Sequence, residues 1–167
     1  MKNKAFLLFL LLVTLGCAKK NNTNVVLSTD LTACPANSNC TYNYYDNANF
    51  TNGNQPVAGN SRVFWYKTMN ANICDATTEF FFKTSMSDTE FDITSSQIAS
   101  GEVFANDFIC PCCDYDLLLK PVGGDIKGKR TDATHWLINA SIIFSTSISA
   151  PADTVVVNQY FIQQPLP

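Results

Sequence analysis

The sequence predicts an all-β protein, a single antiparallel β-sandwich of about 7–9 strands with one short helical turn, stapled by disulfides. Three observations support this class. Apolar and polar residues alternate with a period of two through most of the chain, whereas no long segment has helical spacing. Turn-forming residues separate the apolar runs. Hydrophobic residues make up 46% of the 167 positions, which is enough to form one buried core.

The strands of this sandwich can be placed from the alternation. In chain order, we expect them at residues 25–31, 41–45, 62–69, 77–84, 102–109, 115–120, 125–130, 134–147 and 153–163. The clearest is 134–147, in which Trp136, Ile138 and Phe144 lie on one face. Strand 153–163 is apolar on both faces, which indicates an interior position in the sheet. The first two strands carry the weakest alternation.

The connections between strands are predicted from turn and capping residues. Gly123-Gly124 is expected to form a turn before the strand that follows it. Thr94 or Ser95 is a suitable N-cap for a short helical turn at Ser95–Ser100. The asparagine-rich stretch 46–60 is expected to be a long loop.

The N-terminus has the parts of an export signal. Two lysines within residues 1–4 precede an apolar run, residues 5–15, that is interrupted only by Thr14. A helix of this length reaches about 16 Å, roughly half of the hydrocarbon core, so the run is a signal peptide rather than a membrane span. The signal ends in Gly16-Cys17, which resembles the lipobox of bacterial lipoproteins.

The resemblance to bacterial lipoproteins implies how the chain is processed. Cys17 receives a diacylglyceryl group, and residues 1–16 are removed. Residues 17–24 are then a lipidated, polar tether, and residues 25–167 form the β-sandwich domain. Because no aspartate follows the lipidated cysteine, the resemblance favours the outer membrane, on its periplasmic or surface face.

The charge of the chain excludes one class of partner. The whole chain has a net charge of −3, and loss of Lys2 and Lys4 with the signal leaves −5. Such a surface offers no electrostatic footprint for nucleic acid. The partners that we expect are the membrane, through the lipid, and an envelope protein or a glycan. We expect neither a metal nor a cofactor.

The cysteine count indicates disulfides. Apart from the lipidated residue, the chain has six cysteines, an even number in an exported protein: Cys34, Cys40, Cys74, Cys110, Cys112 and Cys113. We expect Cys34–Cys40 to close a small local ring and Cys74 to join one cysteine of the later cluster. The remaining two could then pair as Cys110–Cys113, although the sequence leaves other pairings open.

The cluster Cys110-Pro111-Cys112-Cys113 also suggests two alternative functions. Its C-P-x-C spacing resembles thiol–disulfide oxidoreductases, whose chemistry needs a low-pKa thiolate at a helix N-terminus. Residues 114–120 alternate instead, and Asp114 and Asp116 would raise a thiol pKa, so structural disulfides are favoured. A thiolate site for zinc or copper(I) that includes Cys74 is the second alternative, although paired C-x-x-C motifs are missing.

Two polar groupings have a functional interpretation and a plainer one. His135 could act as a general base with Asp132, but no G-x-S-x-G elbow accompanies it, and a surface histidine is favoured. Asp88, Glu90 and Asp92 share a face and suggest a cation site. The calcium-loop pattern fails there, so a solvated strand edge is favoured.

The candidate binding surface combines aromatic and basic residues. Residues 62–67 put aromatic side chains on both faces of a strand, and the face outside the core could stack on a sugar ring or on a partner. A glycine-flanked segment adds a small basic patch. The candidate residues are Trp65, Tyr66, Tyr44, Lys127, Lys129 and Arg130.

The sequence therefore predicts a membrane-anchored envelope lipoprotein with a non-catalytic binding or structural role, and we assign no catalytic residue. A further alternative is a periplasmic inhibitor or immunity-type module that binds a hydrolase through the loop at 46–60.

Overall fold

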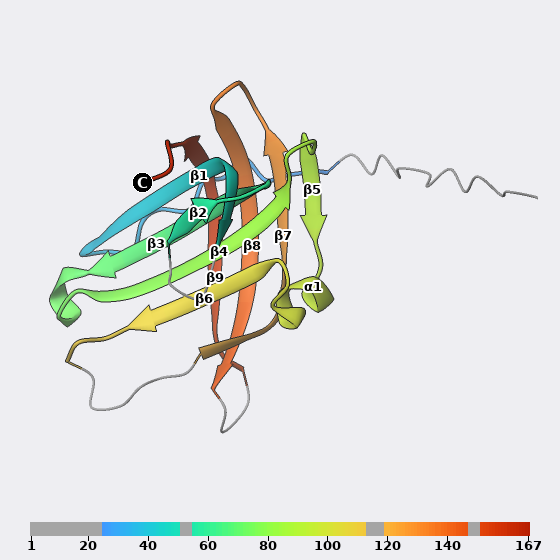
Figure 1. Cartoon of the computed structure of the whole chain (residues 1–167). Coiled ribbons are helices and arrows are strands. Elements are labelled where there is room, and N and C mark those ends of the chain that lie inside the picture. Colours follow the sequence, from blue (N-terminus) through green and yellow to red (C-terminus); the bar gives the residue numbers. More distant parts are fainter. Residues whose placement is uncertain (1–24, 51–54, 113–118, 147–150) are drawn as a thin grey trace, which may run out of the picture.

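The computed structural model describes residues 25–50, 55–112, 119–146 and 151–167 (Figure 1). Its elements, in chain order, are β1 (Ser38–Phe50), β2 (Pro56–Ala58), β3 (Ser61–Asn70), the 3-10 turn η1 (Ala71–Ile73), β4 (Ala76–Ser85), β5 (Glu90–Ile93), α1 (Ser95–Ser100), β6 (Phe104–Ile109), β7 (Leu119–Arg130), β8 (His135–Thr146) and β9 (Pro151–Gln163).

The strands of the described residues form one hydrogen-bonded sheet with the order β5-β7-β8-β9-β1-β3-β4-β6, and β2 pairs with β1. Neighbouring strands are antiparallel except β1 and β9, which pair in parallel through only two residue pairs. The sheet folds over at this short joint, so that the half β5-β7-β8-β9 crosses the half β1-β3-β4-β6 (Figure 1). The predicted all-β sandwich is confirmed, with two layers that belong to one continuous sheet.

The core between the two halves is mainly aromatic. Phe64 stacks on Phe82 from the neighbouring strand, with ring centroids 4.8 Å apart, and meets Trp136 of the other half edge-on at 5.4 Å. Each such pair contributes about 0.5–1.5 kcal/mol beyond the burial of its area. The side chains that fill this core are Tyr44, Phe64, Tyr66, Phe80, Phe82, Phe91, Ile93, Ile98, Phe104, Ile126, Trp136, Ile138, Ala140, Ile142, Phe144, Val157 and Phe161.

A second, smaller cluster lies on the opposite face of β1, β3 and β4. Its buried members are Tyr45, Ala48, Val63 and Phe81, and three partly buried side chains pack against them: Phe50, Trp65 and Leu166. Since neighbouring residues of a strand point to opposite faces, β3 contributes Val63 and Trp65 here and Phe64 and Tyr66 to the core.

Strand β7 corrects one of the predicted turns. The sequence pattern separates 115–120 from 125–130 by a turn at Gly123-Gly124, but the chain runs on as one strand with a register shift between Pro121 and Gly123. Gly124 has a φ of 122°, which a residue with a side chain rarely adopts. Ser95 at the start of α1 fixes this bulge, because its hydroxyl donates to the Gly124 carbonyl at 2.7 Å and accepts from the Gly124 N–H at 3.0 Å.

Two other segments differ from expectation, whereas the helical turn does not. The stretch 46–60 is not a long loop, since it holds the end of β1 and all of β2. Asn47, with a φ of 53°, forms a bulge that lets β1 continue, because asparagine tolerates this conformation. Residues 25–31 form no strand. The turn at Ser95–Ser100 is confirmed, and the Gln97 side chain accepts from the Thr94 N–H at 2.9 Å.

Candidate binding cleft

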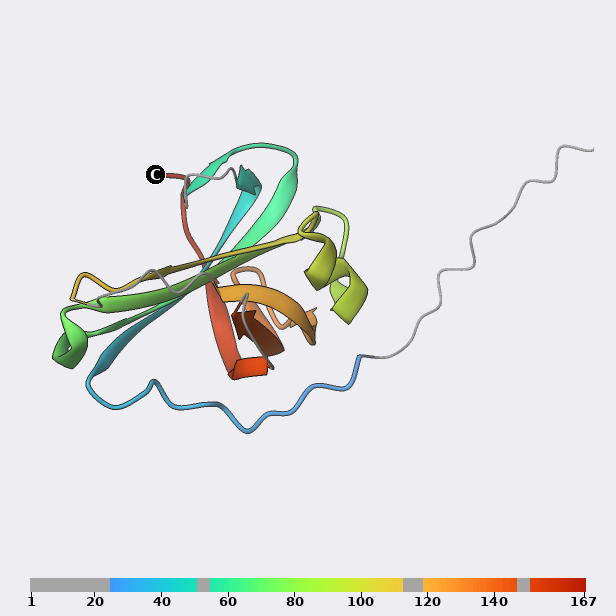
Figure 2. The ribbon, with the colours of Figure 1, turned by 90° about the horizontal axis from the view of Figure 1, so that it is seen from below.

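A cleft begins where β1 and β9 part. The two strands pair at Asn43–Ile162 and Tyr44–Gln163 only. Because both strands run in the same direction from this joint, their earlier residues separate and leave a cleft between the two halves of the sheet. Residues 25–35, which we call the strap, run past β9 before the chain turns into β1 (Figure 2). Thr32, Ala33 and Pro35 of the strap line the cleft.

The cleft has a volume of about 250 Å³ and a neutral, hydroxyl-rich lining. Hydroxyl groups come from Thr32, Tyr42, Tyr66, Thr68, Thr78 and Thr154. The remaining wall is aliphatic and consists of Ala33, Pro35, Val155, Val156 and Val157. No residue of this described lining is charged, so the cleft suits an uncharged ligand that combines hydrogen-bonding groups with an apolar surface.

Tyr42 and Tyr66 form the floor of the cleft. The centroids of their two rings lie 5.6 Å apart, and Tyr66 is only 4% exposed. Burial raises the pKa of Tyr66 to about 12, with a smaller contribution from Tyr42 and an opposing hydrogen bond to Thr68. Burial also raises the pKa of Tyr42. Both phenols are therefore neutral at physiological pH and can each donate as well as accept a hydrogen bond.

The strap is held to β8 and β9 by polar contacts. Thr32 N–H donates to the Asn158 carbonyl at 2.9 Å, and Asn158 N–H donates to the Thr32 hydroxyl at 3.0 Å. Further along, Ser28 N–H donates to the Asn139 side chain at 2.7 Å. Two apolar side chains of the strap, Val26 and Leu31, add little to this attachment, because they are 85% and 46% exposed.

A second hollow adjoins the cleft on the other side of the strap. It has a volume of about 320 Å³ and shares Thr32, Val156 and Val157 with the cleft. Its other wall includes Asp125 of β7 and Asn139 of β8. The strap therefore divides one longer groove over β9 into two parts.

The two disulfides lie at the same end of the β1-β3-β4-β6 half, where β1 begins and β3 ends. Cys34–Cys40 joins the end of the strap to the start of β1, and Cys74–Cys112 joins the turn after β3 to the segment that follows β6. The expected local ring and the expected bond from Cys74 to the later cluster are both confirmed. These bonds exclude Cys74 and Cys112 from a thiolate metal site. Cys110 is also disulfide-bonded.

Other predicted groups lie outside the described residues. These are the lipidation site Cys17, the sixth disulfide candidate Cys113, and Asp114 and Asp116, the acidic residues that follow the cysteine cluster. The expected Cys110–Cys113 pairing and its redox role therefore stay predictions.

The aromatic residues of the predicted binding surface do not form one surface. Tyr44 and Tyr66 are 1% and 4% exposed and belong to the core, although Tyr66 also contributes to the lining of the cleft. Trp65 lies on the outer face, but Phe81 of β4 stacks on one side of it at 5.6 Å and Tyr45 of β1 flanks the other at 6.4 Å. Its indole thus presents an edge rather than an open face for a sugar ring.

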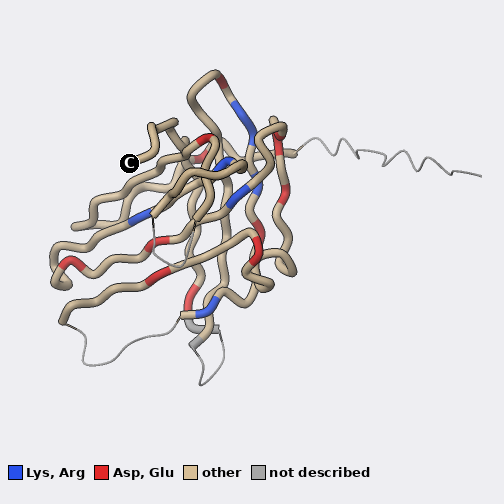
Figure 3. Tube along the Cα trace, viewed as in Figure 1, with Lys and Arg blue, Asp and Glu red and all other residues tan. Residues whose placement is uncertain are grey.

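The predicted basic patch is balanced by acidic neighbours. Lys127 and Lys129 of β7 stand opposite Asp92 and Glu90 of β5, so that the charges alternate across the two strands (Figure 3). Lys127 also contacts the Asp125 carboxylate at 3.3 Å. Such neighbours weaken the attraction of the patch for an anionic partner.

The guanidinium of Arg130, the third member of that patch, is used within its own hairpin. It donates to the carbonyls of Asp132 at 2.9 Å and Ala133 at 2.8 Å. Arg130 therefore stabilises the β7–β8 turn.

The histidine and the acidic triplet support their plainer interpretations. His135 Nδ1 lies 3.0 Å from Asp132 Oδ1, but the same oxygen accepts from Thr134 N–H at 2.7 Å, so the pair closes the β7–β8 turn. The Thr134 N–H and then His135 lower the pKa of Asp132. Of the acidic triplet, Asp88 accepts from Ser85 N–H, while Glu90 and Asp92 lie in β5.

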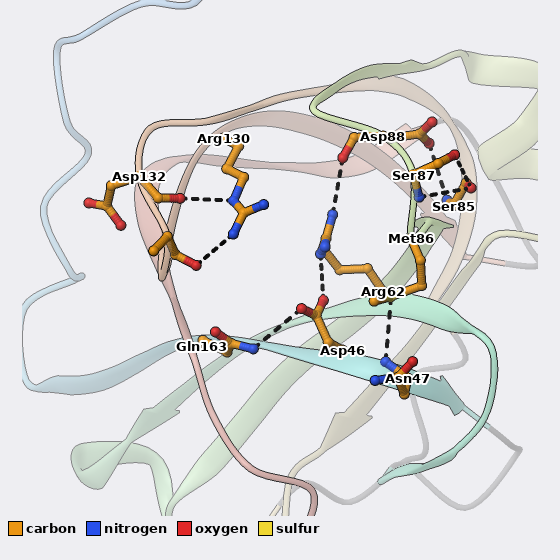
Figure 4. A network of polar contacts seen from close by, with 11 residues as sticks. Asp46, Asn47, Arg62, Ser85, Met86, Ser87, Asp88, Arg130, Asp132 and Gln163 are labelled. Atoms are coloured by element: carbon orange, nitrogen blue, oxygen red, sulfur yellow. Dashed lines mark hydrogen bonds and ion pairs between the residues drawn. The ribbon is translucent and has the colours of Figure 1, made fainter.

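A buried arginine that the sequence analysis did not single out closes the opposite end of the β1–β9 joint (Figure 4). Arg62 is 3% exposed and donates from Nε to Asp46 at 2.6 Å and from Nη1 to the Asp88 carbonyl at 3.2 Å. Its guanidinium lies 4.8 Å from the ring centre of Trp136. Gln163 of β9 donates to the other Asp46 oxygen at 3.3 Å. The alternation of the strand could have revealed it. Arg62 lies two residues before Phe64, so both side chains point to the core face of β3.

Comparison with protein-family models, with curated proteins and with solved structures finds no match to this chain. Within the part of the chain that the structure describes, no helix has the length and apolar character needed to span a membrane.

Proposed function

We propose that the protein is an exported lipoprotein, anchored through a lipid on Cys17, whose β-sandwich is a non-catalytic binding module of the cell envelope. The observation that carries the binding role is the neutral cleft between β1 and β9. Uncharged hydroxyl groups beside an aliphatic wall can bind a ligand by hydrogen bonds and apolar contact together. The two disulfides support export, because such bonds persist in oxidising compartments.

The length of the tether supports a ligand near the membrane. Residues 17–24 span at most about 27 Å when fully extended. The strap that forms one wall of the cleft begins directly after this tether. A lipid on Cys17 would therefore hold the cleft close to the membrane surface, where envelope proteins and glycans are the available partners.

Photocrosslinking in intact cells tests this function. A benzoylphenylalanine at Thr154, an exposed residue of the cleft, should give a distinct adduct in the envelope fraction. The same group at Thr89, which is exposed but outside the cleft lining, is the matched control. A Cys17→Ala variant should lose its lipid and leave the membrane fraction. Equal adducts from both positions, or none from Thr154, would contradict the binding role.

A further inference from the structure

We propose that the cleft binds an extended peptide segment of a partner protein, which adds as a strand to the open edge of β9 at residues 154–156. This inference rests on the proposed binding function and names the ligand of the same site. The recognition would be β-strand addition, in which main-chain hydrogen bonds supply affinity and side-chain pockets supply selectivity.

The open edge follows from how β9 is paired. On one side, β8 pairs with β9 along its whole length. On the other side, β1 pairs only with Ile162 and Gln163, and the strap reaches the edge at Asn158. Among the described residues, no neighbouring strand pairs with this side of β9 before Asn158. An unpaired strand edge of this kind is a template for another chain.

The contact with Thr32 identifies which groups of β9 face the cleft. Asn158 uses both its N–H and its carbonyl toward the strap, so both point away from β8. In an antiparallel ladder every second residue points the same way, so Val156 and Thr154 also direct their main-chain groups into the cleft. The Thr154 N–H donates to the Asp153 side chain at 2.7 Å. Both main-chain groups of Val156 and the Thr154 carbonyl remain to bind a peptide.

The side chains around this edge fit a short uncharged peptide. Alternate residues of an added strand would point toward the apolar interior of the cleft, where Val155 and Val157 form the wall. Hydroxyls of Tyr42, Thr68 and Thr78 lie across from that wall and can bind polar groups. A row of main-chain donors and acceptors matches a peptide better than a glycan, which lacks a regular amide spacing.

The strap shows that this edge can bind extended chain. Thr32 already makes the two contacts with Asn158 that a strand residue would make, one of them through its hydroxyl. Because the strap crosses from β8 toward β1, it occupies only this one position of the edge. A partner peptide would continue the same pairing toward Thr154.

A selection with a defined probe tests the proposal. A phage-displayed library of random nine-residue peptides is selected on the full mature protein, purified from membranes in detergent micelles. We expect enrichment of uncharged peptides in which apolar side chains alternate with polar ones. N-methylation of every second amide in an enriched peptide tests for strand addition. Binding should weaken about tenfold when the methylated amides are those that face β9, and little when they are those that face away.

A proline substitution tests the edge itself. Val156→Pro removes an N–H that faces the cleft and not β8, so the ladder between β8 and β9 is retained. It should weaken peptide binding at least about tenfold. Val156→Ala is the matched control, because it shortens the same cleft side chain but keeps the N–H, so it should weaken binding much less than Val156→Pro does. Circular dichroism and melting temperature verify that both variants are folded.

The possible results distinguish a failure of the peptide proposal from a failure of the proposed binding function. Peptides that bind Val156→Pro as well as the parent would overturn strand addition. If Thr154 gives its envelope adduct but no peptide is enriched, the cleft binds another ligand and only this inference is wrong. If Thr154 gives no adduct and no peptide is enriched, both proposals fail.

Discussion

The two ends of the β1–β9 joint are built in opposite ways. At the closed end, Gln164 N–H donates to the Tyr44 carbonyl at 2.9 Å, and the buried ion pair of Arg62 and Asp46 lies beneath it. At the open end, the strands part around neutral hydroxyls, and Thr32 of the strap reaches the edge of β9. The closed end satisfies its polar groups within the protein, whereas the open end leaves main-chain groups for a ligand.

Contacts that stabilise the joint and groups that are open to a ligand therefore lie at separate places on the same two strands. The charged network at the closed end is hydrogen-bonded on several sides, so it holds the two halves of the sheet together. The open end can then stay unpaired without loss of the fold. Changes at the closed end should affect unfolding, and changes at the open end should affect ligand binding.

The largest expected effect is at the closed end. Arg62→Met should lower the free energy of unfolding by about 3 kcal/mol, because it leaves the partly buried Asp46 carboxylate without its ion pair. Lys67→Met removes a cation that lies 5.8 Å from the Trp65 ring in a more exposed place, and should cost less than about 1 kcal/mol. Chemical denaturation measures both. Equal losses would mean that Arg62 does not close the joint.

A smaller effect is expected where the strap joins β1. The double variant Cys34→Ser and Cys40→Ser opens a ring whose cysteines are six residues apart. On the chain-entropy model this costs about 2 kcal/mol of stability, and it frees the strap to move away from the cleft. Denaturation of the parent and the variant gives the comparison. A variant as stable as the parent would show that the polar contacts of Thr32 hold the strap unaided.

The smallest effect is a pH dependence on the outer face. Desolvation raises the pKa of Glu79, although hydrogen bonding from Trp65 and the charge of Lys67 oppose it. The folded state therefore binds the proton more tightly than the unfolded state, and stability falls as pH rises from the ordinary value of 4.5 through the raised pKa. Glu79→Gln keeps an acceptor for the Trp65 indole, 3.1 Å away in the parent, and should remove this fall.

Unfolding curves recorded for the parent and for Glu79→Gln across that pH range measure the difference. A fall of the same size in both proteins would place its origin at another carboxylate.

The sequence was sufficient for the class of fold because alternation is a local property. Strand β8 follows its alternation, with Trp136 and Ile138 buried on one face. The helical turn at Ser95–Ser100 was predictable from its capping residues. The glycine pair of β7 was misread, because a glycine needed for a turn and one needed for a bulge look the same until the contact with Ser95 is known.

The candidate site was less predictable, because it depends on pairing between distant strands. The lining of the cleft, which includes Tyr42, Thr78 and Val155, forms because β1 and β9 separate after two residue pairs. No local sequence pattern indicates how many residue pairs two distant strands will form. Arg62 could have been found, since it shares the phase of Phe64. Its partner Asp46 lies in an asparagine-rich stretch that resembles a loop, so the ion pair itself required the fold.

Amide hydrogen exchange of single residues shows whether the edge of β9 is open. We expect the Val156 N–H to exchange rapidly, because it faces the open cleft, while the N–H groups of Val157 and Tyr44 exchange slowly within the sheet. Addition of an enriched peptide should then slow the exchange of Val156. If the Val156 N–H were as protected as that of Val157 in the protein without peptide, the edge of β9 would be closed and could not accept an added strand.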